Sequence, residues 1–203
     1  MSKKKIVPPY EKPADISVPA IDTHMHFNRD GINPAEIVEN MQADGLKKII
    51  VVATSQEDVA DALPFVKNNP NVYLAAGIHP YDCDKFTPEF KNLIVTLHKS
   101  LGKKFVAVGE IGLDFSRPEN PSAEEQTRVL VEQLELAREL NLPVILHLRD
   151  AHDLAKKVLA ANKNLFAKRG GVVHCFSGTK QDAEDYLTLG LHLSFTGCIT
   201  YEK

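Results

Sequence analysis

Cysteine is scarce in this 203-residue chain, and its three copies are widely separated: Cys83, Cys175 and Cys198. No Cys-x-x-Cys pair occurs, so neither a disulfide framework nor a zinc ribbon is indicated. A reducing, cytoplasmic environment is therefore expected. No apolar run approaches the ~18 residues of a membrane span. The run Lys3-Lys4-Lys5 is not followed by the apolar stretch of a secretory signal, and we expect no membrane association.

The chain also lacks an excess of charge of either sign. Its net charge is −3, and Lys and Arg are mixed among Asp and Glu, which excludes a broadly basic nucleic-acid coat and an acidic tail. An anionic substrate would have to be held locally, by a metal or by a few cations. A Gly-x-Gly-x-x-Gly fingerprint is absent too, so no dinucleotide site is indicated.

Short apolar strands alternate with amphipathic helices along most of the chain. We expect seven strands, at residues 19–26, 47–53, 72–77, 105–108, 143–146, 171–173 and 191–195. Strict alternation predicts parallel strands joined by helical crossovers, either as a doubly wound open sheet or as a (β/α)8 barrel. Residues 1–18 are polar and rich in proline and predict an irregular arm, so the domain would span residues 19–203.

Candidate metal ligands follow several of these strands. His24 and His26 alternate on the first strand, so both side chains would share one face. Glu110, His147 and His174 come at the ends of later strands. A barrel brings the carboxyl ends of all its strands to one mouth, whereas an open sheet concentrates its site at one switch point. We therefore predict the α/β barrel of the TIM type, with imidazoles and one carboxylate converging on a divalent metal. Taken singly, each histidine also fits a structural or surface role.

Five motifs carry a resemblance to a known family. They are Asp22-Thr23-His24-Met25-His26, Gly77-Ile78-His79-Pro80, residues 109–114 (GEIGLD), residues 143–151 (PVILHLRDA) and residues 174–178 (HCFSG). In this order they resemble the TatD family of metal-dependent deoxyribonucleases, in the amidohydrolase superfamily. The resemblance implies a (β/α)8 barrel that hydrolyses DNA phosphodiester bonds. It implies metal binding by five residues, namely His24, His26, Glu110, His147 and His174.

The resemblance also implies two residues that contact the substrate, and the chemistry of Glu110 allows two metal ions. His79 and Arg149 would lie near the substrate phosphate, as a proton donor and a fork-shaped cation. Glu110 would act in catalysis by bridging two ions, since a carboxylate has two oxygens. Zn²⁺, Mg²⁺ and Mn²⁺ all remain candidates, and so do DNA and RNA as substrates and exonuclease and endonuclease action.

Two departures from the family pattern stand out. Tyr81 occupies a position where the family often has a second histidine. The family pattern also implies an eighth strand with a Thr-Asp-x-Pro motif, whose aspartate is a ligand and base, and the sequence ends at Lys203 before such a strand. We therefore expect about seven strands without the eighth β/α unit, open edges on the first and seventh strands, and doubtful nuclease activity from these residues alone.

Two other functions stay open. A C–N hydrolase of the same superfamily is one, although many of those bridge their metals with a modified lysine where Glu110 stands here. A truncated, non-catalytic barrel kept as a binding or scaffold protein is the other. The absent aspartate favours this last reading, and the intact Glu110 and histidine set opposes it.

Overall fold

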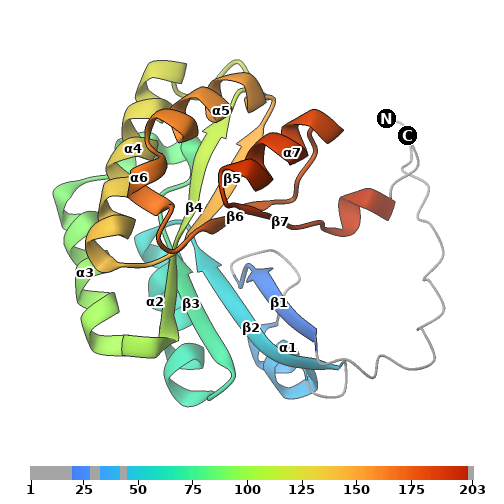
Figure 1. Ribbon diagram of the computed structural model, residues 1–203. Helices are drawn as coiled ribbons and strands as arrows, with labels where there is room; N and C mark the ends of the chain where they lie inside the picture. Colours follow the sequence, from blue (N-terminus) through green and yellow to red (C-terminus); the bar gives the residue numbers. More distant parts are fainter. Residues whose placement is uncertain (1–19, 28–32, 42–44, 201–203) are drawn as a thin grey trace.

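The computed structural model describes residues 20–27, 33–41 and 45–200, and Figure 1 shows a curled sheet with helices along its outer side. The expected arm at residues 1–18 lies outside the described residues. The strands are β1 Ala20–Met25, β2 Leu46–Ala53, β3 Val72–Ala76, β4 Phe105–Asp114, β5 Val144–Arg149, β6 Gly171–His174 and β7 His192–Leu193. The helices are α1 Pro34–Asn40, α2 Gln56–Asn68, α3 Pro88–Leu101, α4 Ala123–Leu140, α5 His152–Ala161, α6 Lys163–Phe166 and α7 Lys180–Thr188. Short 3-10 helices span Pro80–Lys85, Gly102–Lys104 and Gly197–Thr200.

The strand order confirms the barrel-type architecture. Each strand pairs in parallel with the next one in sequence, in the order β1-β2-β3-β4-β5-β6-β7. A doubly wound sheet would reverse its order at a switch point, and this sheet does not. Within the described residues, β1 and β7 form the two edges of the curl. The carboxyl ends of the strands consequently face one common mouth.

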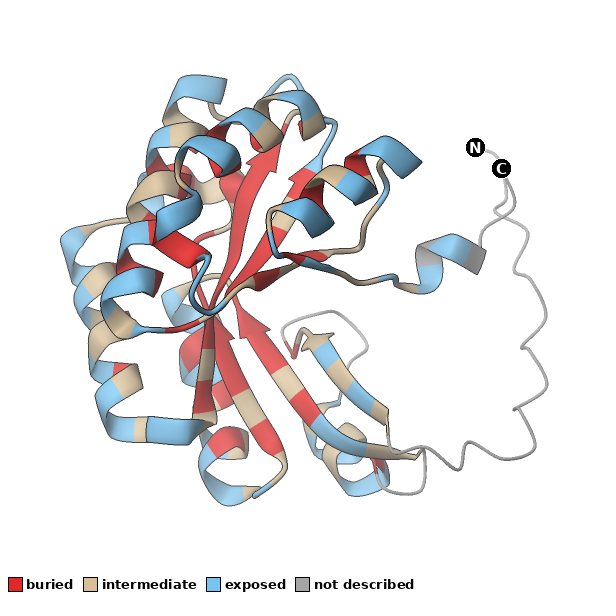
Figure 2. Cartoon of the chain, in the orientation of Figure 1, coloured by how far each residue is buried: buried red, intermediate tan, exposed pale blue. Residues whose placement is uncertain are grey.

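Alternating strand residues build two apolar layers. The larger layer fills the space between the sheet and its helices, and Figure 2 shows it as buried strand and helix faces that meet. A smaller cluster on the concave side contains Val52, Ala75, Ala107 and Ile145, one residue from each of four successive strands. Because side chains on a strand alternate between faces, both layers are supplied by the same strands. The strands are therefore held rigidly beneath the mouth.

The helices begin where the sequence predicts. A capping side chain accepts the main-chain N–H three residues further on at five helix starts: Asn33, Ser55, Thr87, Ser122 and Thr179. Each such cap satisfies a donor that has no partner within its helix. Two of the expected helix ends are also found, with Gly102 and Gly190 at positive φ. None of the helices in the described parts of the chain combines the length and apolar character that a membrane span requires.

Two strand lengths differ from expectation. β4 was expected at residues 105–108 and runs to Asp114, so Glu110 lies within the strand. The extension depends on Gly112, whose φ is 152° and whose absent Cβ would meet the His147 carbonyl oxygen at 1.9 Å. β7 was expected at residues 191–195 and contains two residues. There the Ser194 N–H still donates to Val173, but the Ser194 carbonyl accepts from Phe176, so the regular ladder ends.

Candidate metal centre

His24 lies in β1 and His26 directly follows the strand, with the two rings edge to face. His26 Nδ1 lies 3.0 Å from the carbonyl oxygen of Val52 on β2, which can only accept a hydrogen bond. Nδ1 therefore carries the proton, and the lone pair of Nε2 faces the mouth. The Nε2 atoms of His24 and His26 lie 3.0 Å apart. A ring nitrogen fixed in this way by its neighbour is the usual arrangement of a metal-binding histidine.

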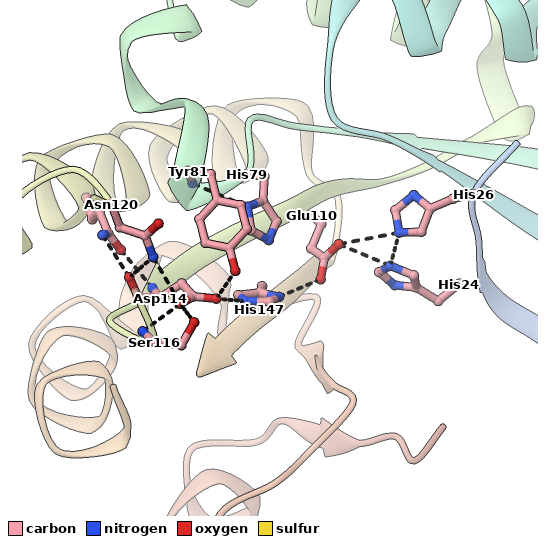
Figure 3. A network of polar contacts seen from close by, with 10 residues as sticks. His24, His26, His79, Tyr81, Glu110, Asp114, Ser116, Asn120 and His147 are labelled. Atoms are coloured by element: carbon pink, nitrogen blue, oxygen red, sulfur yellow. Dashed lines mark hydrogen bonds and ion pairs between the residues drawn. The ribbon is translucent and has the colours of Figure 1, made fainter. Parts of the chain in front are cut away.

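Glu110 lies at the centre of the site. Its side chain is only 5% exposed, and its Oε2 lies 3.1 Å from His24 Nε2 and 3.8 Å from His26 Nε2. Its other oxygen, Oε1, lies 3.0 Å from His147 Nδ1. Burial disfavours the carboxylate, but hydrogen bonds and charge from His147 and His24 outweigh it and hold the pKa of Glu110 well below its usual value. Glu110 is thus a buried carboxylate with an imidazole nitrogen at each oxygen, as Figure 3 shows.

Two groups of donor atoms share this carboxylate. One contains His24, Glu110 and His174, and the other contains His79, Glu110 and His147; the donor atoms of each group lie within 4.8 Å of one another. The His174 ring is stacked on that of His24, with centroids 3.3 Å apart. Burial, followed by the nearby His24, lowers the pKa of His174 to about 4, so His174 is neutral at pH 7 and its lone pair is available.

His147 is held between two carboxylates. Its Nδ1 faces Glu110, and its Nε2 lies 2.7 Å from Asp114 Oδ2. Burial opposes the charged ring, but both acids outweigh it and raise the pKa of His147. His147 and Glu110 were expected together from their strand ends, and the structure brings them into contact.

His79 lies beside His147 with a defined tautomer. The ring centroids are 4.3 Å apart. The main-chain N–H of Tyr81 donates to His79 Nδ1 at 3.3 Å, which places the remaining proton of a neutral ring on Nε2. Burial and the neighbouring His147 lower the pKa of His79 to about 4, so the ring is neutral at pH 7. Its Nε2–H is then a hydrogen-bond donor, and that nitrogen offers no lone pair to a metal.

Arg149 lies at the mouth, outside both groups. It is the last residue of β5, and its side chain is exposed. Its main chain is anchored, because its carbonyl accepts from the N–H of Phe115. An exposed guanidinium on an anchored strand end remains available to an incoming anion.

Asp114 is the last residue of the motif at residues 109–114, and the structure gives it contacts that the motif alone did not predict. It is fully buried, and its Oδ2 accepts from the Tyr81 hydroxyl at 2.8 Å as well as facing His147. Its Oδ1 accepts from the main chain and hydroxyl of Ser116 and from Asn120. The available signal was a second acid four residues after Glu110 in the same strand, since buried carboxylates need partners.

Two buried glutamines of α4 hold the main chain next to the site. Gln133 Oε1 accepts from the Ile78 N–H and its Nε2 donates to the Ile78 carbonyl, just before His79. Seven residues earlier, Gln126 makes the same pair of bonds with Asp114. Residues seven apart lie on the same helix face, here an otherwise apolar one. Glutamine at such core positions was the sequence signal for this pairing.

The residues present fit divalent ions. The donors are imidazole nitrogens and carboxylate oxygens, the types that bind zinc and related ions. His26 is held in the tautomer that leaves Nε2 unprotonated. The buried Nδ1 of His24 has no hydrogen-bond partner within the described residues. Together with the two-sided Glu110, these features make this a candidate centre for two ions.

Comparison with known proteins decides the family. The sequence model of the TatD related DNase family matches residues 21–203.

This chain belongs to the TatD-related DNase family.

Relatives and a solved structure agree with this assignment. The metal-dependent hydrolase YjjV of Escherichia coli K12 is 40% identical over 186 residues, which are 90% of this chain and 70% of YjjV. The 3'-5' ssDNA/RNA exonuclease TatD of Rahnella is 35% identical, over 89% of this chain and 66% of the exonuclease. The crystal structure of YjjV superposes with a TM-score of 0.79 at 38% identity, covering 89% of this chain and 69% of YjjV. The predicted TatD resemblance is thus confirmed, and the protein is a TatD-family hydrolase.

Proposed function

We propose that this TatD-family protein hydrolyses phosphodiester bonds of DNA with the help of two divalent metal ions. The observation that carries the proposal is Glu110, a buried carboxylate whose two oxygens face separate sets of histidines. A carboxylate so placed would hold two divalent cations and compensate part of their charge. Bound divalent ions would supply Lewis-acid stabilisation of the phosphate and a water of lowered pKa.

Four histidines and Glu110 would hold the ions. His24, His26 and His174 lie on one side of Glu110, and His147 lies on the other. Imidazole-rich sites favour zinc and similar transition ions, whereas magnesium prefers oxygen ligands. We therefore propose zinc first, with manganese as the alternative.

His79 and Arg149 would act on the substrate. The Nε2–H of His79 would donate a hydrogen bond to a phosphate oxygen beside the ions. The guanidinium of Arg149 would pair with a phosphate at the mouth, since its fork matches two phosphate oxygens. The nuclease names of relatives such as the Rahnella exonuclease support a nucleic-acid substrate. We choose single-stranded DNA as the first substrate to test, with RNA second.

We also propose that the protein works in the cytoplasm. The buried Cys83 is a free thiol, which suits a reducing compartment.

The test is hydrolysis of end-labelled single-stranded DNA by metal-stripped protein, with and without added zinc or manganese. We expect cleavage only with metal, and none from Glu110→Gln. Arg149→Ala should mainly raise KM, because its role is to bind phosphate. Arg128→Ala is the matched control, because Arg128 forms an exposed ion pair with Glu132 on α4. Full cleavage in excess chelator, or by Glu110→Gln, would refute the proposed function.

A further inference from the structure

The contact between Asp114 and His147 is the starting point for a more specific inference. Asp114 Oδ2 lies 2.7 Å from His147 Nε2 and accepts the Tyr81 hydroxyl at 2.8 Å. Asp114 Oδ1 accepts from the Ser116 N–H at 2.8 Å, the Ser116 hydroxyl at 2.6 Å and Asn120 at 3.2 Å. Figure 3 shows these contacts as one line running from Asp114 through His147 to Glu110.

These contacts argue against Asp114 as a ligand or a general base. The residue is fully buried and both oxygens already accept hydrogen bonds. Asp114 contacts His147 at Nε2, on the opposite side of the ring from Glu110 at Nδ1, so it supports the ring and does not reach the ions.

The effect of Asp114 on His147 follows from the geometry of the ring. An imidazole has two nitrogens, and an acceptor at one nitrogen places a proton there. Asp114 accepts from Nε2, so Nδ1 is the nitrogen left to face Glu110 Oε1 at 3.0 Å. A carboxylate behind a metal-binding histidine fixes both its tautomer and its ring orientation.

Tyr81 links this acid to the second histidine of the mouth. Its hydroxyl donates to Asp114, and its main-chain N–H donates to His79 Nδ1. Its ring packs edge-on against His79, and the Arg117 guanidinium lies 5.4 Å from its centroid. Tyr81 is also the residue that departs from the family pattern. One tyrosine thus contacts both the acid behind His147 and His79 itself.

We propose that Asp114 is a positioning residue that holds His147 with its Nε2 proton turned away from Glu110 and its Nδ1 directed at the metal, and that Tyr81 keeps Asp114 in place. The proposal rests on the metal site of the proposed function.

Asp114→Asn is the sharpest test because its amide orientation is set by the structure. Three donors from Ser116 and Asn120 surround the Oδ1 position, so the amide oxygen takes that side. The amide NH₂ then faces His147 Nε2, which must become the acceptor, and the proton moves to Nδ1. Zinc affinity should fall about 10- to 100-fold, the usual effect of losing such a partner.

Tyr81→Phe tests the second part without reversing the tautomer. It removes one hydrogen bond to Asp114 and leaves the His147 contact in place. Zinc affinity should fall roughly 3- to 10-fold, the equivalent of one hydrogen bond. This variant also keeps the proposal testable if Asp114→Asn does not fold.

The experiment combines a zinc titration, using a competing chelator, with ring-nitrogen NMR of the zinc-loaded protein. Wild type and Tyr81→Phe should show a downfield His147 Nε2–H, and Asp114→Asn should lack it. Asp182→Asn is the matched control, because Asp182 is another buried acid with hydrogen bonds to Thr179 and Lys156. It should bind zinc like wild type.

The outcomes separate this inference from the proposed function. A wild-type protein that binds no zinc contradicts the metal site itself. If wild type binds zinc, equal affinity in Asp114→Asn with the Nε2–H retained overturns the role of Asp114. Unchanged affinity in Tyr81→Phe overturns the role of Tyr81.

Discussion

Replacing Gln133 by methionine tests whether α4 holds the mouth of the barrel in place. Gln133 is 1% exposed, and its amide makes two bonds to the main chain of Ile78, at 2.8 and 3.0 Å. Methionine has a similar length and fills the same space but offers neither bond. The Ile78 N–H and carbonyl would then be buried without these partners.

The expected magnitude follows from those two groups. Each buried main-chain group without a partner costs about 1–3 kcal/mol. Apolar burial of the methionine side chain returns part of this, so the free energy of unfolding should fall by about 2–4 kcal/mol. For a chain of this size, that lowers Tm by roughly 4–16 °C. Since Ile78 precedes His79, DNA hydrolysis should fall as well, at temperatures where the variant is still folded.

Urea unfolding and thermal melting measure the effect. Gln181→Met is the matched control, because Gln181 is exposed on α7 and its amide donates to Asp185 on the same helix. We expect the control to change stability by less than about 0.5 kcal/mol. A Gln133→Met protein as stable as that control would refute the argument that these bonds fix the β3 end of the mouth.

Three further substitutions have defined outcomes. Lys104→Met should lower the free energy of unfolding by about 1.5–3 kcal/mol in urea titrations, because its ammonium donates to three carbonyls, those of Val66, Asn69 and Val72. Gly112→Ala should abolish zinc binding or soluble expression, because its Cβ would meet the His147 carbonyl at 1.9 Å; unchanged binding would contradict the packing of β4 on β5. Asp182→Asn should make the free energy of unfolding depend less on pH in the acid range. Burial opposes its charge, but Lys156 and Thr179 outweigh this and hold the pKa of Asp182 well below its usual value. Its stabilisation is therefore present above the unfolded pKa near 3.8 and is lost as the pH falls below it. Urea unfolding between about pH 5 and pH 2 checks this, and an unchanged pH dependence would rule it out.

Periodicity and capping residues predicted the alternation of elements, because both are local properties of the chain. Ser55, Thr87 and Thr179 begin helices as expected, since a cap depends on residues only a few positions away. The same patterns could not set the end of β4. In the sequence, Gly109 and Gly112 indicated a strand boundary. Only the packing of β5 against β4 shows that a side chain at either position would collide with β5.

The sequence predicted the candidate ligands of the site but not the residues that support them. His24, His26, Glu110, His147 and His174 are four histidines and one acid within or next to successive apolar strands, and the structure brings them together. The supports act across elements: Gln133 reaches from α4 to the main chain after β3, and the Tyr81 hydroxyl reaches an acid of β4. Such pairings depend on three-dimensional packing and leave only weak marks in a single sequence, such as a glutamine on an apolar helix face.

The most direct test of the central claim is the number of zinc ions bound per chain by wild type and by Glu110→Gln. Glu110 has His24 at one oxygen and His147 at the other, so one side chain should join two ions in one centre. We predict two bound zinc ions in wild type and at most one, bound more weakly, in Glu110→Gln. Equal stoichiometry and equal affinity in the two proteins would contradict the account.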